Sequence, residues 1–206
     1  MKVKLNAKAR KILRGIQTEI QNLYNYHSHK DITYYVSQTE KVNGFSGIRS
    51  KEAEVDPLNF LFGVSDAPIL RLSKKILNEL ELGQTSYRTK LILIEEITHF
   101  EDQLHHYPNR MGINYSFRER VSEELLADLS RLIIGSVHGI EDIFMDEESL
   151  ESDRNKKRVY DWADKYCEGI SEYFSGISDK QQLIKLRALA HKHGKERLVY
   201  AKKLIE

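Results

Sequence analysis

The chain has 206 residues, of which 40% are hydrophobic and 31% charged, and its formal net charge is +1. This composition is typical of a globular protein, and the apolar runs are too short to predict a membrane-spanning segment or a membrane partner. A single cysteine, Cys167, excludes an intramolecular disulfide and a thiolate metal cluster, and it favours a reducing, cytoplasmic location.

The charges are unevenly distributed along the chain. Residues 1–14 carry six Lys or Arg and no acid, and residues 179–206 carry eight Lys or Arg against three acids, so the residues between them are net acidic. Two basic ends are typical of segments that contact an anionic partner or the acidic body of the same chain. The candidate phosphate or nucleic-acid contacts in the first segment are Lys8, Arg10, Lys11 and Arg14.

The first half of the chain predicts helices with one interruption. Three prolines, eleven glycines and apolar residues at three- and four-residue spacing indicate a mainly α-helical fold. A first helix is expected at about 6–26 and a second at about 66–82, with Gly83 as its stop. Alternating residues followed by turn residues predict a candidate small β-hairpin near 31–49, inside an irregular or β excursion at about 28–64.

The second half predicts four more helices. One begins at Thr85 or Ser86 and runs through Tyr107, and the next, at about 116–145, starts with a capping box of Ser116 and Glu119. A charged connector then precedes helices at about 153–175 and 179–205, the latter capped by Ser178. We therefore expect a single helical domain spanning 1–206, built as a five- or six-helix bundle.

The residues LILIEEITHFEDQLHH, at 91–106, gather acids and histidines on one helix. Glu96 and His99 form a Glu-x-x-His step, the spacing with which one helix offers a carboxylate and an imidazole to a metal in di-iron bundles. Such bundles need a second copy of this step, and this sequence has none. The favoured interpretation is a solvated polar face.

The helix expected at 116–145 carries a polar row opposite its apolar stripe. If a divalent metal ion is bound, its expected ligands are Glu96, Glu124 and Asp128. Paired acidic helices of this kind resemble those that hold Mg²⁺ in all-α nucleotide pyrophosphohydrolases, although the acids here depart from that family's spacing.

Two further residues of this polar row favour metal-free phosphodiester chemistry. Arg131 and His138 lie seven positions apart on one helix face, where an arginine can anchor a phosphate and a histidine can move a proton. The pair resembles the Arg and His of HEPN-type helical nucleases, at the upper limit of their spacing. His99 is the second expected acid–base residue.

Two histidine pairs lie outside these rows. His27 and His29, in NYHSHKD, have a spacing that can chelate a metal from an extended segment, but we interpret them as polar residues near a helix end. His191 and His193 are interpreted as part of a basic surface.

Three functions therefore remain open. The leading prediction is an intracellular binding or regulatory protein that acts through protein–protein contacts or self-association, because Gly135 and Gly139 within one helix favour close packing of a partner. The alternative is a nuclease or nucleotide phosphohydrolase that uses the His, Arg and carboxylate residues named above. The third is nucleic-acid binding through the basic ends.

Overall fold

The computed structural model describes residues 3–38, 53–56, 58–61, 64–107, 116–140 and 169–206. Two compact units divide the chain, the first from residues 1–22 and 26–113 and the second from residues 23–25 and 114–206. Within the described residues, no helix is long and apolar enough to cross a membrane. The single-domain organisation stays a prediction.

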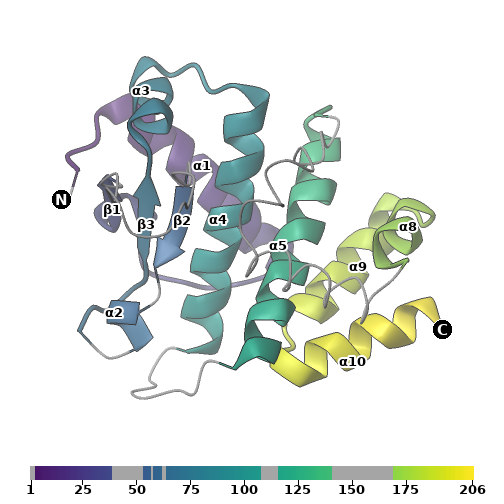
Figure 1. Ribbon diagram of the computed structural model, residues 1–206. Coiled ribbons are helices and arrows are strands. Elements are labelled where there is room, and N and C mark those ends of the chain that lie inside the picture. Colours follow the sequence, from purple (N-terminus) through teal and green to yellow (C-terminus); the bar gives the residue numbers. More distant parts are fainter. Residues whose placement is uncertain (1–2, 39–52, 57, 62–63, 108–115, 141–168) are drawn as a thin grey trace, which may run out of the picture. The chain divides into compact units, whose positions relative to one another are not determined.

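The first unit combines helices with a small sheet (Figure 1). Parallel pairing joins β1 to β3 and antiparallel pairing joins β2 to β3, so the strand order is β1-β3-β2. The long helix α4 packs against β2 and β3. The elements of this unit are α1 (Ala7–Tyr24), the 3-10 helix η1 (Ile32–Tyr34), β1 (Val36–Gln38), β2 (Ala53–Asp56), α2 (Leu58–Leu61), β3 (Ile69–Leu72), α3 (Lys74–Leu82) and α4 (Tyr87–His106).

The described part of the second unit is helical. It contains α5 (Phe117–Val137), α8 (Ile170–Ser175), α9 (Asp179–Ala190) and α10 (Gly194–Ile205). Helix α10 packs against the other three. The fully buried Arg197 of α10 donates to the carbonyl oxygens of Leu189 and Ser122, and so links α10 to both α9 and α5.

The mainly α-helical fold class with a small β element is confirmed, as are several predicted helix ends. Ser86 caps α4 through the Thr89 amide, and Ser116 and Glu119 form the expected capping box of α5. Gly83 ends α3 in the left-handed conformation, with φ of 75°. These signals are local in sequence, which is why the pattern predicted them.

The helix expected at 66–82 is wrong in its first part. Residues 69–72 are strand β3, and Ser73 caps the shorter helix α3. Burial alternates along Ile69–Leu72, with Leu70 and Leu72 fully buried, because successive side chains of a strand point to opposite faces of the sheet. Of the candidate hairpin near 31–49, the described residues 36–38 form β1, which pairs with β3. Residues 39–49 lie outside the described part, so the hairpin itself stays a prediction.

Two long helices are shorter than expected. Helix α5 ends at Val137 rather than near 145, and Gly139 follows it with φ of 66°, so Gly139 belongs to the helix end rather than to a packing face. The helix expected at 179–205 is two helices, α9 and α10, because His193 is extended and Gly194 has φ of 51°. Of the helix expected at 153–175, residues 153–168 lie outside the described part, as does Cys167.

Candidate functional site

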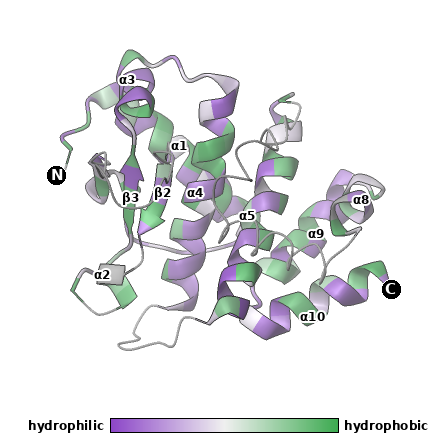
Figure 2. Cartoon of the chain, in the orientation of Figure 1, coloured by the Kyte–Doolittle hydropathy of each residue, from purple (hydrophilic) through white to green (hydrophobic). Residues whose placement is uncertain are grey.

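Helix α4 is not the solvated helix predicted for residues 91–106. Figure 2 shows its first half as mainly hydrophobic and its second half as mainly hydrophilic, yet Leu93–Gln103 is buried throughout. The acids remain buried because they accept hydrogen bonds: Val55 N donates to Glu96 Oε2 over 2.8 Å, and Gln17 Nε2 donates to Glu101 Oε1 over 2.6 Å. The solvated-face interpretation is therefore wrong, and the acids have structural partners.

A return segment, defined as residues 26–32, follows α1 and runs back beside it. Asn25 adopts the left-handed conformation with φ of 59°, which asparagine tolerates better than most residues. The amide of Tyr26 then donates to the Gln21 carbonyl over 2.9 Å, a bond that spans five residues and closes the helix end. The chain reverses direction at this point.

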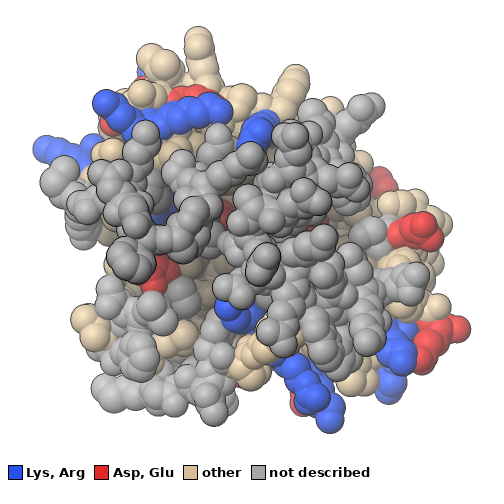
Figure 3. All heavy atoms as spheres, viewed as in Figure 1, with Lys and Arg blue, Asp and Glu red and all other residues tan. Residues whose placement is uncertain are grey.

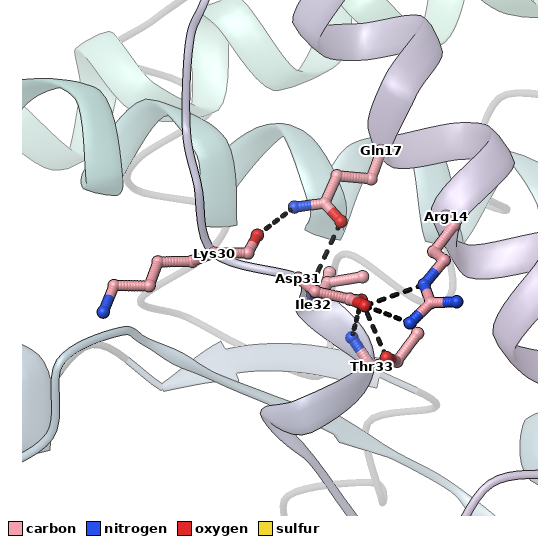
Figure 4. Close-up of polar contacts among 6 residues, drawn as sticks. All are labelled: Arg14, Gln17, Lys30, Asp31, Ile32 and Thr33. Atoms are coloured by element: carbon pink, nitrogen blue, oxygen red, sulfur yellow. Dashed lines mark hydrogen bonds and ion pairs between the residues drawn. The ribbon is translucent and has the colours of Figure 1, made fainter.

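Side chains of α1 hold the backbone of the return segment (Figure 4). Gln17 Nε2 donates to the Lys30 carbonyl over 2.7 Å, and Gln17 Oε1 accepts from the Ile32 amide over 3.1 Å. One turn earlier, Arg14 forms an ion pair with Asp31. The Gln17 side-chain amide thus uses both its NH₂ group and its oxygen to satisfy backbone groups of the return segment.

Asp31 fixes the end of the return segment. Its carboxylate accepts from the Thr33 amide over 3.0 Å and from the Thr33 hydroxyl over 2.7 Å, and so caps η1. Partial burial raises its pKa, but hydrogen bonds from Arg14 and Thr33 outweigh this effect and leave the pKa below its ordinary value. Asp31 therefore stays ionised and paired at neutral pH.

A buried aspartate joins the return segment to α4. Tyr26 Oη donates to Asp102 Oδ1 over 3.0 Å, and His106 Nε2 lies 3.4 Å from the same oxygen. The Tyr26 ring stacks on the His105 ring with centroids 4.0 Å apart and planes inclined by 10°. Asp102 is only 1% exposed. This buried carboxylate therefore holds the Tyr26 ring directly, and the Tyr26 ring in turn packs against His105.

A pocket of 320 Å³ opens beside the return segment. Its apolar surface comes from Phe60, Leu104 and the stacked pair of Tyr26 and His105, whereas His27 and His29 are exposed at its polar side. Lys30 Nζ is 2.5 Å from Asp66 Oδ2, and Tyr35 Oη donates to Asp66 Oδ1 over 3.0 Å. The complete lining is Tyr26, His27, Ser28, His29, Lys30, Phe60, Asp66, Leu104 and His105.

The hydrogen bonds to Asp66 have a chemical consequence. The bond from Lys30 lowers the pKa of the Asp66 carboxyl, and that from Tyr35 adds to the effect. Lys30 shows the complementary effect, because its bond to Asp66 raises the pKa of the ammonium. The rim of the pocket therefore carries an exposed ion pair beside three imidazoles, which can donate or accept hydrogen bonds.

The predicted metal and acid–base residues divide between the two units. Glu96 and His99 are buried in the first unit, at 7% and 9% exposure, and Glu96 holds the Val55 amide of β2. Glu124 and Asp128 lie half-buried on α5 in the second unit. A single site formed by all of them stays a prediction.

The predicted nuclease pair lies on α5 and at its end. Arg131, 8% exposed, forms an ion pair with Asp128, with Nη2 and Oδ1 3.2 Å apart. His138 is exposed at the C-cap of the helix. The expected phosphate anchor thus already has a carboxylate partner one turn away on the same helix, and a role in catalysis stays a prediction.

The four basic candidates of α1 are exposed, but two of them have intramolecular partners. Lys8 Nζ donates to the Leu82 carbonyl over 3.4 Å, and Arg14 pairs with Asp31. On the face drawn in Figure 3, Lys and Arg lie beside Asp and Glu. Arg10 and Lys11 are likewise exposed, and nucleic-acid binding by these residues stays a prediction.

Sequence reasoning placed His27 and His29 only near a helix end, and it missed Gln17 and Glu101, which hold the return segment beside the pocket, although one signal was present. Gln17 follows Leu13 by four positions and precedes Ile20 by three, so it interrupts the buried stripe of α1. Glu101 similarly follows Ile97 by four positions. A polar residue inside an apolar stripe indicates a buried hydrogen bond, and here that bond joins Gln17 to Glu101.

No protein-family model matches this sequence, and neither a curated protein nor a solved structure does. The function of this protein is therefore inferred from the geometry of its site.

Proposed function

We propose that the first unit is a small-molecule binding module whose ligand occupies the pocket beside the return segment. The observation that carries this proposal is one 320 Å³ pocket with apolar surface and convergent polar groups. Ligand sites in proteins typically have volumes of roughly 300–1,000 Å³ and the same division between apolar walls and a few polar groups.

The lining favours a ligand with a planar ring and an anionic group. Phe60 and the stacked His105 offer flat ring faces against which a planar ring can pack. His29 and Lys30 offer nitrogen donors for a phosphate, sulfonate or carboxylate, and the ligand's anionic group competes with Asp66 for Lys30. The ligand is therefore an amphipathic small anion.

Like the leading prediction from the sequence, this proposal describes a binding protein. It differs in that the partner bound in the pocket is a small molecule. A cytoplasmic location is part of the proposal, supported by the single cysteine of the sequence. Action through protein–protein contacts or self-association, phosphodiester or nucleotide hydrolysis, and nucleic-acid binding stay predictions.

The first test uses anilinonaphthalene sulfonate, a fluorescent compound with planar rings and one anionic group. We expect the full chain to bind one equivalent, and His105→Ala to weaken binding about tenfold, which corresponds to about 1.4 kcal/mol. Phe60→Leu is expected to weaken binding by a smaller factor, because it keeps an apolar side chain but removes the flat ring. Fluorescence titration and calorimetry measure both affinity and stoichiometry.

The matched control is His191→Ala, which removes an exposed histidine from the end of α9 and is expected to leave binding unchanged. Thermal unfolding checks that each variant stays folded. The proposal is overturned if the wild-type chain does not bind the compound, or if the His105 and His191 variants bind it equally well.

A further inference from the structure

One wall of the pocket depends on a hydrogen bond network deeper in the unit. His27, Ser28, His29 and Lys30 line the pocket and all belong to the return segment. The backbone of this segment is held at Lys30 and Ile32 by the side chain of Gln17. Whatever orients the Gln17 amide therefore also orients the pocket wall.

Glu101 orients that amide from the other side. Gln17 Nε2 donates both to Glu101 Oε1, over 2.6 Å, and to the Lys30 carbonyl, over 2.7 Å. The carboxyl group on α4 and the return segment thus share a single NH₂ group, which has two hydrogens to donate. Displacement of the Glu101 carboxyl removes one of the three hydrogen bonds that orient the Gln17 amide and so weakens its hold on the return segment.

The surroundings of Glu101 offer no compensating charge within the described residues. Glu101 is 0% exposed, and α1 presents the neutral amides of Gln17 and Gln21 to it. The charged groups of the return segment, Lys30 and Asp31, are paired with Asp66 and Arg14.

On α4 itself, the titratable neighbours of Glu101 are engaged elsewhere. Asp102 accepts from Tyr26 and lies close to His106, and His105 stacks on Tyr26. Burial therefore raises the pKa of the Glu101 carboxyl to about 7 from its ordinary value of 4.5, although hydrogen bonds from Gln17 and Gln21 oppose the shift.

We propose that Gln17 and Glu101 form a proton-dependent latch on the return segment. With Glu101 protonated, the latch keeps the pocket wall against α1; with Glu101 ionised, water competes for the carboxylate and the segment detaches more often. The consequence for ligand affinity rests on the proposed function, whereas the latch itself does not.

The direction of the pH dependence follows from proton linkage. The closed latch binds its proton up to about pH 7, whereas an opened, hydrated Glu101 loses its proton near the ordinary value of 4.5. Opening is therefore favoured as the pH rises through this interval, by up to about tenfold per pH unit, and levels off above it.

The test measures amide hydrogen exchange of Ile32 in the full chain between pH 4.5 and 8.5, corrected for the intrinsic exchange rate. We expect its protection factor to fall by one to two orders of magnitude up to about pH 7 and then to level off. Glu101→Gln, which is neutral at every pH, is expected to remove this dependence. Glu81→Gln, an exposed acid at the end of α3, is the matched control and is expected to keep it.

A second measurement needs no variant. The side-chain carboxyl carbon of Glu101 is followed by NMR in the wild-type chain, and we expect it to titrate near pH 7 together with the Ile32 amide. The latch is overturned if Glu101 titrates near 4.5, or if Ile32 protection has the same pH dependence in the wild type and in Glu101→Gln.

Ligand binding measured at two pH values distinguishes the proposed latch from the proposed binding function. Anilinonaphthalene sulfonate is expected to bind the wild type more weakly at pH 8 than at pH 5.5, and Glu101→Gln is expected to show a smaller difference between the two pH values. A titrating latch in a chain that does not bind this compound overturns the binding function alone. Binding whose pH dependence is the same in the wild type and in Glu101→Gln overturns the latch alone.

Discussion

Gln17 and Arg197 are buried polar side chains that bind backbone groups. Gln17 satisfies the Lys30 carbonyl and the Ile32 amide in the first unit. In the second unit, Arg197 donates to the Leu189, Ala190 and Ser122 carbonyl oxygens over 3.0, 3.2 and 3.0 Å. Leu189 and Ala190 are the last residues of α9, and the Leu189 carbonyl also accepts from the Lys192 amide over 3.0 Å, so Arg197 adds side-chain donors at this helix end.

Arg197→Met is expected to destabilise the chain by about 3 kcal/mol, because it keeps the apolar stem but removes the three hydrogen bonds that this buried side chain donates. Arg197→Lys is also expected to be destabilising, since one ammonium cannot replace three guanidinium nitrogens spread over a plane. Urea unfolding followed by circular dichroism measures both changes.

Lys203→Met is the control for this prediction, since it removes an exposed cation from the same helix. We expect the control to stay within about 0.5 kcal/mol of the wild type. If Arg197→Met matches it, the three hydrogen bonds do not stabilise the second unit.

At the scale of elements, two glycines have opposite roles in their helices. Gly15 lies inside α1, and a Cβ atom added there would meet open space. Gly194 starts α10 with φ of 51°, and a Cβ atom added there would lie 3.4 Å from Glu119 Cγ. Glycine inside a helix costs conformational entropy, but at positive φ it avoids strain that any other residue would meet.

Gly15→Ala is therefore expected to stabilise the chain by about 0.5–1 kcal/mol, and Gly194→Ala to destabilise it by about 1–2 kcal/mol. Paired urea unfolding curves measure the two free energies in one experiment. If both substitutions change the unfolding free energy in the same direction, backbone conformation does not explain the different roles of Gly15 and Gly194.

The same contrast explains which elements the sequence could predict. The caps at Ser86 and Ser116 and the stop at Gly83 depend on residues within one turn, so a local pattern is enough. Strand β3 depends on partner strands: its Leu70 pairs with Val36 and Val55, which lie 34 and 15 positions away, and a local pattern does not contain these partners. The break between α9 and α10 is set by backbone conformation at Gly194, in a stretch whose apolar period continues.

At the scale of the whole molecule, the spacing of apolar residues predicts which side of a helix each residue lies on. It does not predict which helix faces pack against one another. Acids of α4 were predicted to be solvated because they lie opposite an apolar stripe, yet Glu96 and Glu101 are buried with donors from β2 and α1. His105 lies 76 positions from His29 and 78 from His27, and all three still line one pocket. Only the reversal of the chain after Asn25 brings them together.

The carboxyl groups of the first unit give its stability two opposite pH dependences. The lowered pKa of Asp31, and that of Asp66, supply stability that is present at neutral pH and lost as the pH falls through those lowered values. The raised pKa of Glu101 acts the other way, since its stability is fully present below 4.5 and is lost as the pH rises to about 7. These groups together favour a stability maximum in mildly acidic solution.

The contribution of Glu101 is isolated by comparing the wild type with Glu101→Gln at each pH, because all other titrating groups then cancel. Between pH 4.5 and 7, the wild type is expected to lose about 3 kcal/mol of unfolding free energy relative to the variant, and to change little more above pH 7. The measurement is urea unfolding of both proteins at half-unit pH steps. If the difference in unfolding free energy between the two proteins stays constant with pH, Glu101 titrates alike in the folded and unfolded chains. If the wild type instead loses stability relative to the variant as the pH falls, the fold stabilises the carboxylate rather than the neutral acid.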